Sequence, residues 1–166
     1  MKNPLFFFAM ITKDLVRKLA QERIDELDRG LFIVDISISK KSVIELEIDK
    51  VEGYVAIEDC VSVSRNVEHN LDREEQDFSL EVASAGVSSP LKLVRQYKKN
   101  IGRTIKVKTI SLEEIEAKLT MADDEKITLE WQAREPKKIG KGKETVDKKL
   151  ELSYENIKEA IVIISF

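Results

Sequence analysis

The serines of a short uncharged stretch are the first side chains that could do chemistry. Residues 82–91 contain no ionisable side chain in a protein that is 36% charged, and they include Ser84, Ser88 and Ser89. A catalytic serine needs a general base within hydrogen-bond reach. The only histidine is His69, which the helical spacing places on the exposed face of a helix. We therefore expect no serine nucleophile in this stretch.

A phosphate-binding loop is the second chemistry that this stretch could perform. Such loops carry GxxxxGK[ST] or GxGxxG at the start of a helix. Here Gly86 is the one glycine, and no lysine adjoins it. Because residues 84–91 lie between two different sequence patterns, we interpret them as a junction between domains. Small side chains allow close approach of two domains, glycine allows unusual backbone angles, and proline stiffens the exit. The junction residues of interest are Ser84, Gly86, Ser89 and Pro90.

Metal and acid–base chemistry find little support in the sequence. One histidine and one cysteine are too few for a metal site of recognisable spacing. The adjacent carboxylates Glu58 and Asp59 begin a predicted helix, where negative charge stabilises the helix N-terminus. The alternative is that Glu58 and Asp59 contact a protein partner. The sequence thus predicts no catalytic residue, no bound metal and no cofactor.

Basic side chains form two groups in the C-terminal half. The first lies at the start of a predicted barrel and consists of Lys98, Lys99, Arg103, Lys106 and Lys108. The second lies in a predicted loop, residues 134–149, with seven Lys+Arg against three Asp+Glu, and includes Lys137, Lys138, Lys141 and Lys143. A flexible basic loop can follow a phosphate backbone, so both groups are candidate RNA contacts. The alternative is a solvated loop whose lysines only favour solubility.

Net charge differs between the two halves of the chain. Residues 1–90 hold 11 Lys+Arg and 18 Asp+Glu, a net charge of −7, whereas residues 91–166 hold 17 and 13, a net charge of +4. An acidic half joined to a basic half predicts two units with different partners. The basic half is the candidate for RNA. A phosphate backbone repels the acidic half unless that half faces away or meets a basic protein.

Length and composition indicate a soluble protein of one or two small domains. The chain has 166 residues, 42% of them apolar, and its single cysteine excludes an internal disulfide and fits a reducing cytosol. The apolar run in residues 1–10 is too short to span a bilayer and lacks a signal-peptide cleavage site. We expect a cytoplasmic protein that binds no membrane. Residues 1–10 are either an arm packed on the core or a segment upstream of a start at Met10.

Helical and strand periodicities alternate in the N-terminal half. The predicted order is helix, strand, strand, helix, strand, over residues 12–29, 31–39, 43–49, 57–72 and 78–82. Thr12 caps the first helix and Gly30 ends it. Apolar and small side chains recur at helical spacing along the second helix and are expected on its buried face, namely Ile57, Cys60, Val61, Ser64, Val67 and Leu71. Residues 11–83 are therefore expected to form an α/β domain with two helices on one side of a sheet. This element order is similar to that of a KH domain, but the RNA-clamping GXXG loop is absent.

After Pro90 the pattern changes to short strands. A helix of about two turns is followed by RTIKVKT, EIEAKLTMA, KITLEWQA, KKLELS and EAIVIISF. Five short strands in succession predict a small closed barrel over residues 92–166. Trp131 alternates in phase with Ile127 and Leu129, which favours a core position over a base-stacking one.

Several stretches together resemble the bacterial ribosome maturation factor RimP family. They are LEIDKVEGYVAIEDC, VSVSRNVEHNLD, FSLEVASAGVSSPL, YKKNIGRTIKVKT and LELSYENIKEAIVI, within a resemblance that covers nearly all of residues 10–166. The family's Asp-Asp-Cys at the second helix reads Glu58-Asp59-Cys60 here. The family's junction, Glu-Val-Ser-Ser-Pro-Gly-Leu-Asp-Arg-Pro-Leu, aligns with residues 81–91, where Ala85 replaces the first proline and Ser88-Ser89 replaces Asp-Arg.

The resemblance implies an α+β protein with a KH-like two-helix, three-strand domain and an Sm-like, or SH3-like, β-barrel. It implies a non-enzymatic assembly factor that binds the free small ribosomal subunit and assists its late maturation. The implied partners are ribosomal RNA and a basic ribosomal protein, with no small-molecule substrate. We expect a monomer. The competing interpretation is an Sm-like RNA-binding regulator that acts on free RNA.

Overall fold

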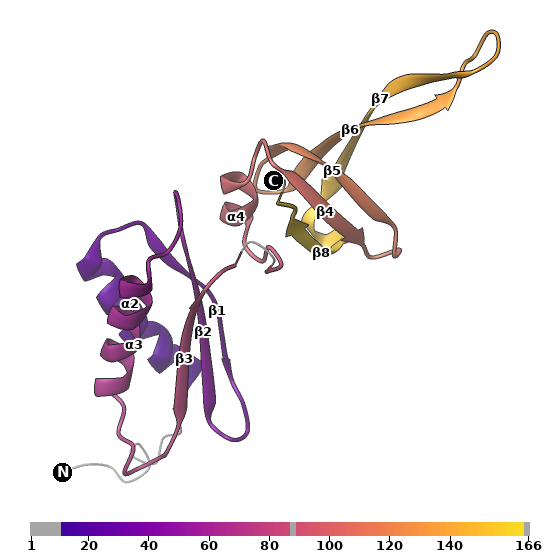
Figure 1. The fold of residues 1–166 in the computed structure, drawn as a ribbon. Helices are drawn as coiled ribbons and strands as arrows, with labels where there is room; N and C mark the ends of the chain where they lie inside the picture. The colour runs from indigo at the N-terminus through magenta and orange to yellow at the C-terminus, as the bar shows by residue number, and fades with distance from the viewer. Residues whose placement is uncertain (1–10, 87–88, 165–166) are drawn as a thin grey trace. The chain divides into compact units, whose positions relative to one another are not determined.

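A computed structural model describes residues 11–86 and 89–164 of the protein (Figure 1). The chain divides into two compact units between Ala85 and Gly86, inside the segment interpreted as a junction. The N-terminal segment predicted to pack on the core, residues 1–10, and junction residues 87–88 lie outside the described residues. Within the described ranges, no helix is long and apolar enough to cross a membrane.

Unit 1 is a three-stranded sheet with two helices on one face (Figure 1). Its elements are α2 (Lys13–Leu27), β1 (Leu31–Ile38), β2 (Val43–Lys50), α3 (Ile57–His69) and β3 (Ser79–Ser84). The strand order is β1-β2-β3, in which β1 pairs antiparallel with β2 and β2 pairs parallel with β3. The parallel pair requires a crossover, which α3 supplies. The predicted order of elements is confirmed in this unit.

The first helix begins where the sequence indicated and ends earlier than expected. The hydroxyl of Thr12 accepts a hydrogen bond from the N–H of Leu15 at 3.1 Å, as an N-cap does. The helix ends at Asp28, which takes a left-handed conformation with φ 48°, so Gly30 is not the residue that ends it. Short polar side chains such as aspartate tolerate this conformation, which is why the glycine was not needed.

The second helix is rotated relative to the predicted orientation. Ile57 and Val61, expected to be buried, are 80% and 41% exposed. The buried positions are Asp59, Val63 and Val67, which recur every four residues along one face. A carboxylate was not expected in an apolar stripe. It can occupy one here because its oxygens have partners inside the unit, described below.

The core of unit 1 lies between the helices and the sheet. The alternate β2 residues Ile44, Leu46 and Ile48 are at most 1% exposed, as the period-two pattern predicted. They pack with Val16 and Val63 from the two helices. The opposite face of the sheet therefore carries the intervening, mostly polar residues.

Unit 2 is a five-stranded antiparallel sheet with a short helix. Its elements are α4 (Val94–Lys99), β4 (Thr104–Thr109), β5 (Glu114–Ala122), β6 (Lys126–Pro136), β7 (Lys143–Ser153), a 3-10 helix (Tyr154–Asn156) and β8 (Ile157–Val162). The strand order is β7-β6-β5-β4-β8. The predicted closed barrel is therefore wrong, since β7 and β8 are the two edges of an open sheet among the described residues. Among the described residues, β7 pairs only with β6 and β8 only with β4, so no ladder joins the two edges of the sheet.

The core of unit 2 forms on the inner face of this sheet. Ile105, Val107, Leu119, Ile127 and Leu129 are all 0% exposed. Trp131 is half-buried against the same cluster, as its phase indicated. The ring of Tyr97 from α4 meets the ring of Tyr154 edge-on, with 5.0 Å between their centroids. Burial raises the pKa of both tyrosines to about 12, so both hydroxyls stay protonated at neutral pH.

Candidate nucleic-acid interface

The β6–β7 hairpin extends beyond the sheet as a two-stranded arm, residues 131–148 (Figure 1). Strand β5 pairs with β6 only between residues 127 and 130. From Trp131 onward β6 pairs with β7 alone, up to the pair Pro136–Lys143. Six residues of strand span about 20 Å. The segment predicted as a loop, residues 134–149, is therefore mostly strand, and only residues 137–142 form a turn.

Cross-strand contacts hold the shaft of the arm together. Gln132 donates a hydrogen bond to Asp147 at 3.1 Å, and Arg134 donates one to the hydroxyl of Thr145 at 3.0 Å. An ion pair joins Lys148 to Glu135. An isolated two-stranded hairpin is only marginally stable, so such pairs matter here. The charged side chains of Lys148, Glu135 and Asp147 therefore already have partners within the shaft.

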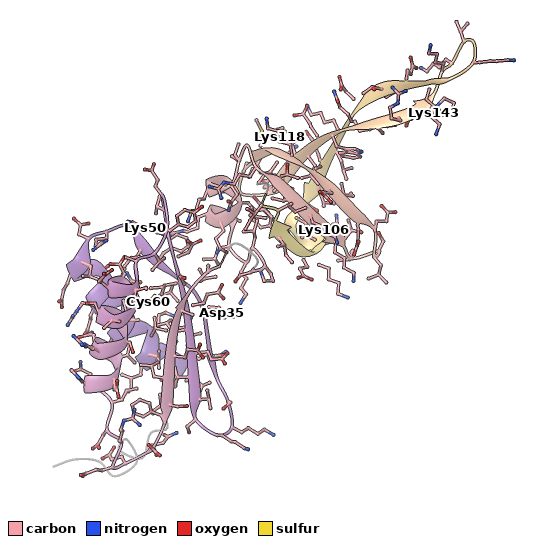
Figure 2. The ribbon with its side chains drawn as sticks, viewed as in Figure 1. Asp35, Lys50, Cys60, Lys106, Lys118 and Lys143 are labelled. Atoms are coloured by element: carbon pink, nitrogen blue, oxygen red, sulfur yellow. The ribbon has the colours of Figure 1, made fainter. Side chains whose placement is uncertain are left out.

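The positive charge of the arm is concentrated at its tip, residues 137–143. The tip carries four lysines and no acidic residue, namely Lys137, Lys138, Lys141 and Lys143. The rest of residues 134–149 holds three basic and three acidic side chains, so the whole excess of +4 lies in the tip. None of these lysines takes part in an ion pair within the described ranges. Figure 2 shows Lys143 on the arm. Four uncompensated lysines on one turn are suited to phosphate contacts.

The lysines of β4 have a different environment, although the sequence grouped them as equal candidates. Lys106 and Lys108 lie on the outer face of the sheet (Figure 2 labels Lys106). Lys106 lies opposite Glu116, and its ammonium is 3.6 Å from a carboxylate oxygen of Glu114. Lys108 lies opposite Glu114 on one side and Glu159 on the other. Two lysines among three carboxylates give this face no positive excess.

The remaining basic candidates, Lys98, Lys99 and Arg103, surround the end of α4. The ammonium of Lys98 is 2.6 Å from a carboxylate oxygen of Asp124. Lys99 is half-buried, whereas Arg103 is exposed in the turn before β4. The structure therefore does not bring the nine basic candidates into one continuous surface. The tip is the part with the highest density of unpaired positive charge.

Asp59, one of the two protein-contact candidates, lies inside unit 1. It is 1% exposed. One carboxylate oxygen accepts the N–H of Ala56 at 3.2 Å, and the other is 3.2 Å from Nε of Arg29. Both interactions stabilise the fold at the start of α3. Asp59 is therefore not available to a partner, and the helix-stabilising interpretation fits it.

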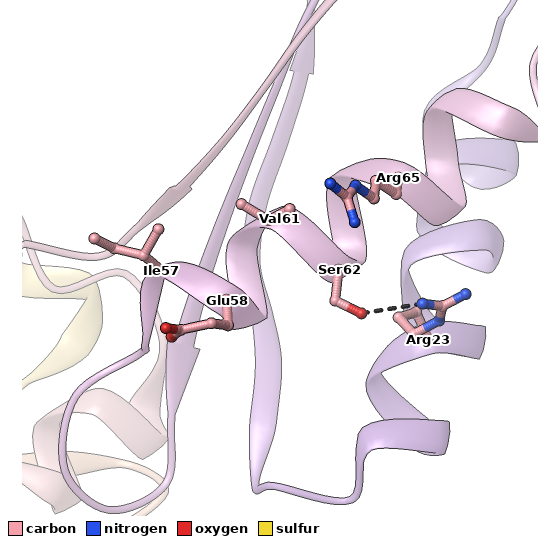
Figure 3. Close-up of a pocket in the computed structure, with 6 residues that line it drawn as sticks. All are labelled: Arg23, Ile57, Glu58, Val61, Ser62 and Arg65. Atoms are coloured by element: carbon pink, nitrogen blue, oxygen red, sulfur yellow. Dashed lines mark hydrogen bonds between the residues drawn. The ribbon is translucent and has the colours of Figure 1, made fainter.

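Glu58, the other protein-contact candidate, lies on the surface. It lines a shallow pocket of about 290 Å³ together with Ile57, Val61, Arg23 and Arg65 (Figure 3). Arg23 is fixed there by donating a hydrogen bond to the hydroxyl of Ser62 at 3.0 Å. The pocket thus combines two aliphatic side chains with charges of both signs.

A group of carboxylates that the site prediction did not name lies on the open face of the unit 1 sheet. Register places Asp35 opposite Glu47 and Glu45 opposite Glu81. Figure 2 labels Asp35 on β1. Like charges directly opposite each other destabilise a sheet, so the Glu45–Glu81 pair is expected to lower the stability of unit 1. The alternation in VIELEID pointed to an acidic face, but only the pairing of β2 with both neighbours assembles it.

The remaining reactive side chains form no catalytic arrangement among the described residues. Cys60 is half-buried, and burial, with the nearby Asp59 carboxylate, raises the pKa of its thiol. The thiol is therefore protonated at neutral pH and weakly reactive. His69 is exposed at the end of α3. No group of three His, Cys, Asp or Glu side chains in residues 11–86 and 89–164 could hold a metal ion.

Two hydrogen bonds link Gly86 and Ser89 in the junction. The N–H of Gly86 donates to the hydroxyl of Ser89 at 3.1 Å, and the N–H of Ser89 donates to the carbonyl of Gly86 at 2.9 Å. Gly86 is not among the glycines with positive φ, contrary to the expected use of unusual backbone angles. Ser84 ends β3, and Pro90 follows Ser89.

Comparison with known proteins assigns the chain to a family. The family model "RimP N-terminal domain" matches residues 19–88. The chain is 53% identical over 157 residues to "Ribosome maturation factor RimP" of Flavobacterium psychrophilum, which covers 95% of this chain and 100% of that protein. The chain belongs to the RimP family. The RimP protein of Christiangramia forsetii is 53% identical over 154 residues, or 93% of this chain and 99% of that protein.

A more distant RimP relative shows the same extent of match. The protein of that name from Porphyromonas gingivalis is 34% identical over 142 residues, or 84% of this chain and 92% of that protein. The matches to RimP proteins thus include both units described above, whereas the family model covers most of unit 1 and the first part of the junction.

Proposed function

We propose that this protein is a non-catalytic assembly factor that binds the free small ribosomal subunit and assists its late maturation. The observation that carries the proposal is 53% identity, along nearly the whole chain, to two proteins named as ribosome maturation factors. The protein acts in the cytoplasm, as a monomer and without a cofactor.

Ribosomal RNA is the partner we assign to unit 2. The tip of the arm, residues 137–143, supplies four lysines and no acidic residue, and a two-stranded arm presents them away from the sheet. Lysines contribute to RNA binding mainly by releasing counterions from phosphates, which requires that they are not already paired with carboxylates. Arg103 and the lysines of β4 and α4 make a smaller contribution.

A basic ribosomal protein is the partner we assign to unit 1. Its open sheet face presents Asp35, Glu45, Glu47 and Glu81, and Glu58 lies at the surface of α3. Carboxylates repel the RNA backbone and attract a basic protein surface. Contact with such a surface would also relieve the repulsion between the facing carboxylates.

The finer fold description belongs to the same proposal. Within unit 1, we assign residues 11–83 to a KH-like domain, because the order of helices and strands there is that of such a domain. Within unit 2, we assign residues 92–166 to an Sm-like domain. Its last strand, β8, pairs with its first strand, β4. Residues 84–91 act as the junction that links them.

Sedimentation of cell lysate through a density gradient tests the proposal. We expect the protein in the fractions of free small subunits and not in those of whole ribosomes. A matched variant with glutamine in place of the four tip lysines should move to the top of the gradient. If the unaltered protein stays at the top with free RNA, even at low salt, the ribosome assignment fails. An RNA-binding regulator acting on free RNA then becomes the better description.

A further inference from the structure

The most exposed large apolar side chain in the described residues lies at the tip of the arm. Ile139 is 90% exposed, more than Ile57, Tyr54 or any other residue of its kind. It is the only apolar side chain between Pro136 and Val146. An isoleucine this exposed buries little surface against its own unit, so it contributes little to the stability of the fold and is available to a partner.

The backbone of the tip holds Ile139 at its apex. The N–H of Lys137 donates to the carbonyl of Gly142 at 3.0 Å and closes a four-residue turn, Lys138 to Lys141. Gly140 and Gly142 have φ values of +87° and +98°, which other residues rarely adopt. Nothing lies within 4 Å of the position of a Cβ at either glycine. The turn thus places one aliphatic side chain between two lysines with open space around it.

Charge and shape together select the ligand that fits such a tip. A partner must accept four positive charges and offer an apolar surface for a single side chain. RNA does both, since phosphates lie beside the faces of bases and sugars. A protein partner needs clustered carboxylates, and a membrane surface needs a broad apolar face rather than one side chain. Paired A-form RNA has a major groove too narrow for side chains, so base faces are accessible where the helix is interrupted.

We propose that the arm is a wedge that recognises an interruption in an RNA helix. Ile139 packs against an unstacked base at a bulge or internal loop, while Lys138 and Lys141 contact the phosphates on either side. Apolar side chains act in this way on DNA, where they insert between base steps next to basic residues. The inference rests on the assignment of RNA to the arm, and it adds that the arm reads structure in RNA as well as charge.

Binding of the full-length protein to two synthetic RNAs tests the wedge. One RNA is a continuous duplex, and the other is the same duplex interrupted by an internal loop. Replacing Ile139 with serine should weaken binding to the interrupted duplex roughly tenfold, because one buried aliphatic side chain is lost. Binding to the continuous duplex should change little. The salt dependence of both should stay the same, since no charge is removed. Ile139→Leu should keep the affinity of the unaltered protein.

Ile110→Ser provides the matched control. Ile110 is also an exposed isoleucine at a turn of unit 2, 61% exposed, but it lies after β4 and outside the tip. Equal losses from Ile139→Ser and Ile110→Ser, or equal losses on the two RNAs, would overturn the wedge. A loss confined to intact small subunits would place Ile139 on a ribosomal protein and also overturn it. If removing the tip lysines leaves every RNA affinity unchanged, the assignment of RNA to the arm fails as well.

Discussion

Two basic regions of unit 2 are similar in sequence and different in space. The tip of the arm has four lysines in seven residues, and β4 has two lysines on one strand face. On β4 the neighbouring strands place three carboxylates around the lysines, whereas the tip has no neighbouring strand beyond its own two. For a lysine inside a sheet, strands that are distant in sequence therefore determine which charges lie nearby. For a lysine at the end of an arm, the residues next to it in sequence determine which charges lie nearby.

The largest effect should come from removing the charge of the tip. Replacing Lys137, Lys138, Lys141 and Lys143 with glutamine should lower affinity for a ribosomal RNA fragment roughly a hundredfold at low salt. The slope of log K against log salt should fall by about 3, because each phosphate contact contributes about 0.7–0.9. Fluorescence anisotropy over a range of salt concentrations measures both values. Lysine-to-arginine changes at the four positions serve as the control and should preserve them. If the slope of log K against log salt does not change, the tip lysines make no phosphate contacts, and the tip would not differ from β4 in RNA binding.

A gain of binding should follow when the carboxylates around β4 are neutralised. Replacing Glu114, Glu116 and Glu159 with glutamine frees Lys106 and Lys108, so affinity for the same RNA should rise roughly tenfold at low salt. The matched control changes three exposed glutamates of unit 1, Glu22, Glu74 and Glu75. An equal gain from that control would mean that only net charge matters, and the local comparison would be broken.

Removing the β4 lysines themselves should have a small effect. Lys106→Gln combined with Lys108→Gln should reduce RNA affinity by less than about threefold, because both lysines already lie among carboxylates. The measurement is the same anisotropy titration. A loss as large as that of the tip variant would show that the carboxylates do not offset these lysines.

The smallest effect on binding should come from a change in the body of the sheet. The hydroxyl of Tyr154 donates a hydrogen bond to the carbonyl of Asp123 at 2.6 Å. Tyr154→Phe should lower the free energy of unfolding by about 1 kcal/mol, which thermal or denaturant unfolding measures. RNA affinity should remain within about twofold, since the tip lies far from this bond along the arm. A large loss of affinity with intact folding would make the body part of the RNA surface.

Local sequence patterns predicted most of the individual elements. The N-cap and periodicity of α2, the alternation in β2 and the phase of Trp131 all depend on neighbouring residues, and the structure agrees with them. Long-range pairing was harder to predict. The parallel β2–β3 pair and the open edges of unit 2 depend on contacts between distant segments.

Two errors have physical causes that the pattern alone did not contain. The orientation of α3 was wrong because Asp59 occupies its buried stripe, which required the guanidinium of Arg29 from elsewhere in the fold. The sequence predicts a loop over residues 134–149 because this segment contains Pro136 and two glycines. Proline is tolerated at the end of the strand, and the glycines serve the turn. The sequence alone identified the four tip lysines as candidates for RNA contact. Only the strand register showed that they lie apart from the other five basic candidates.

The pairing of β8 with β4 has a consequence for how unit 2 forms. These strands are the first and last of its sheet, and they join residues such as Ile105 and Val162 that are far apart in the chain. The three hairpins from β4 to β7 can form from local contacts, but one edge of β4 stays unpaired until residues 157–162 are available. Closing so long a loop is slow compared with forming a hairpin. During synthesis, unit 1 can fold first, and unit 2 cannot be completed before residues 157–162 are made. A newly made chain thus acquires its complete sheet only when β8 has been synthesised.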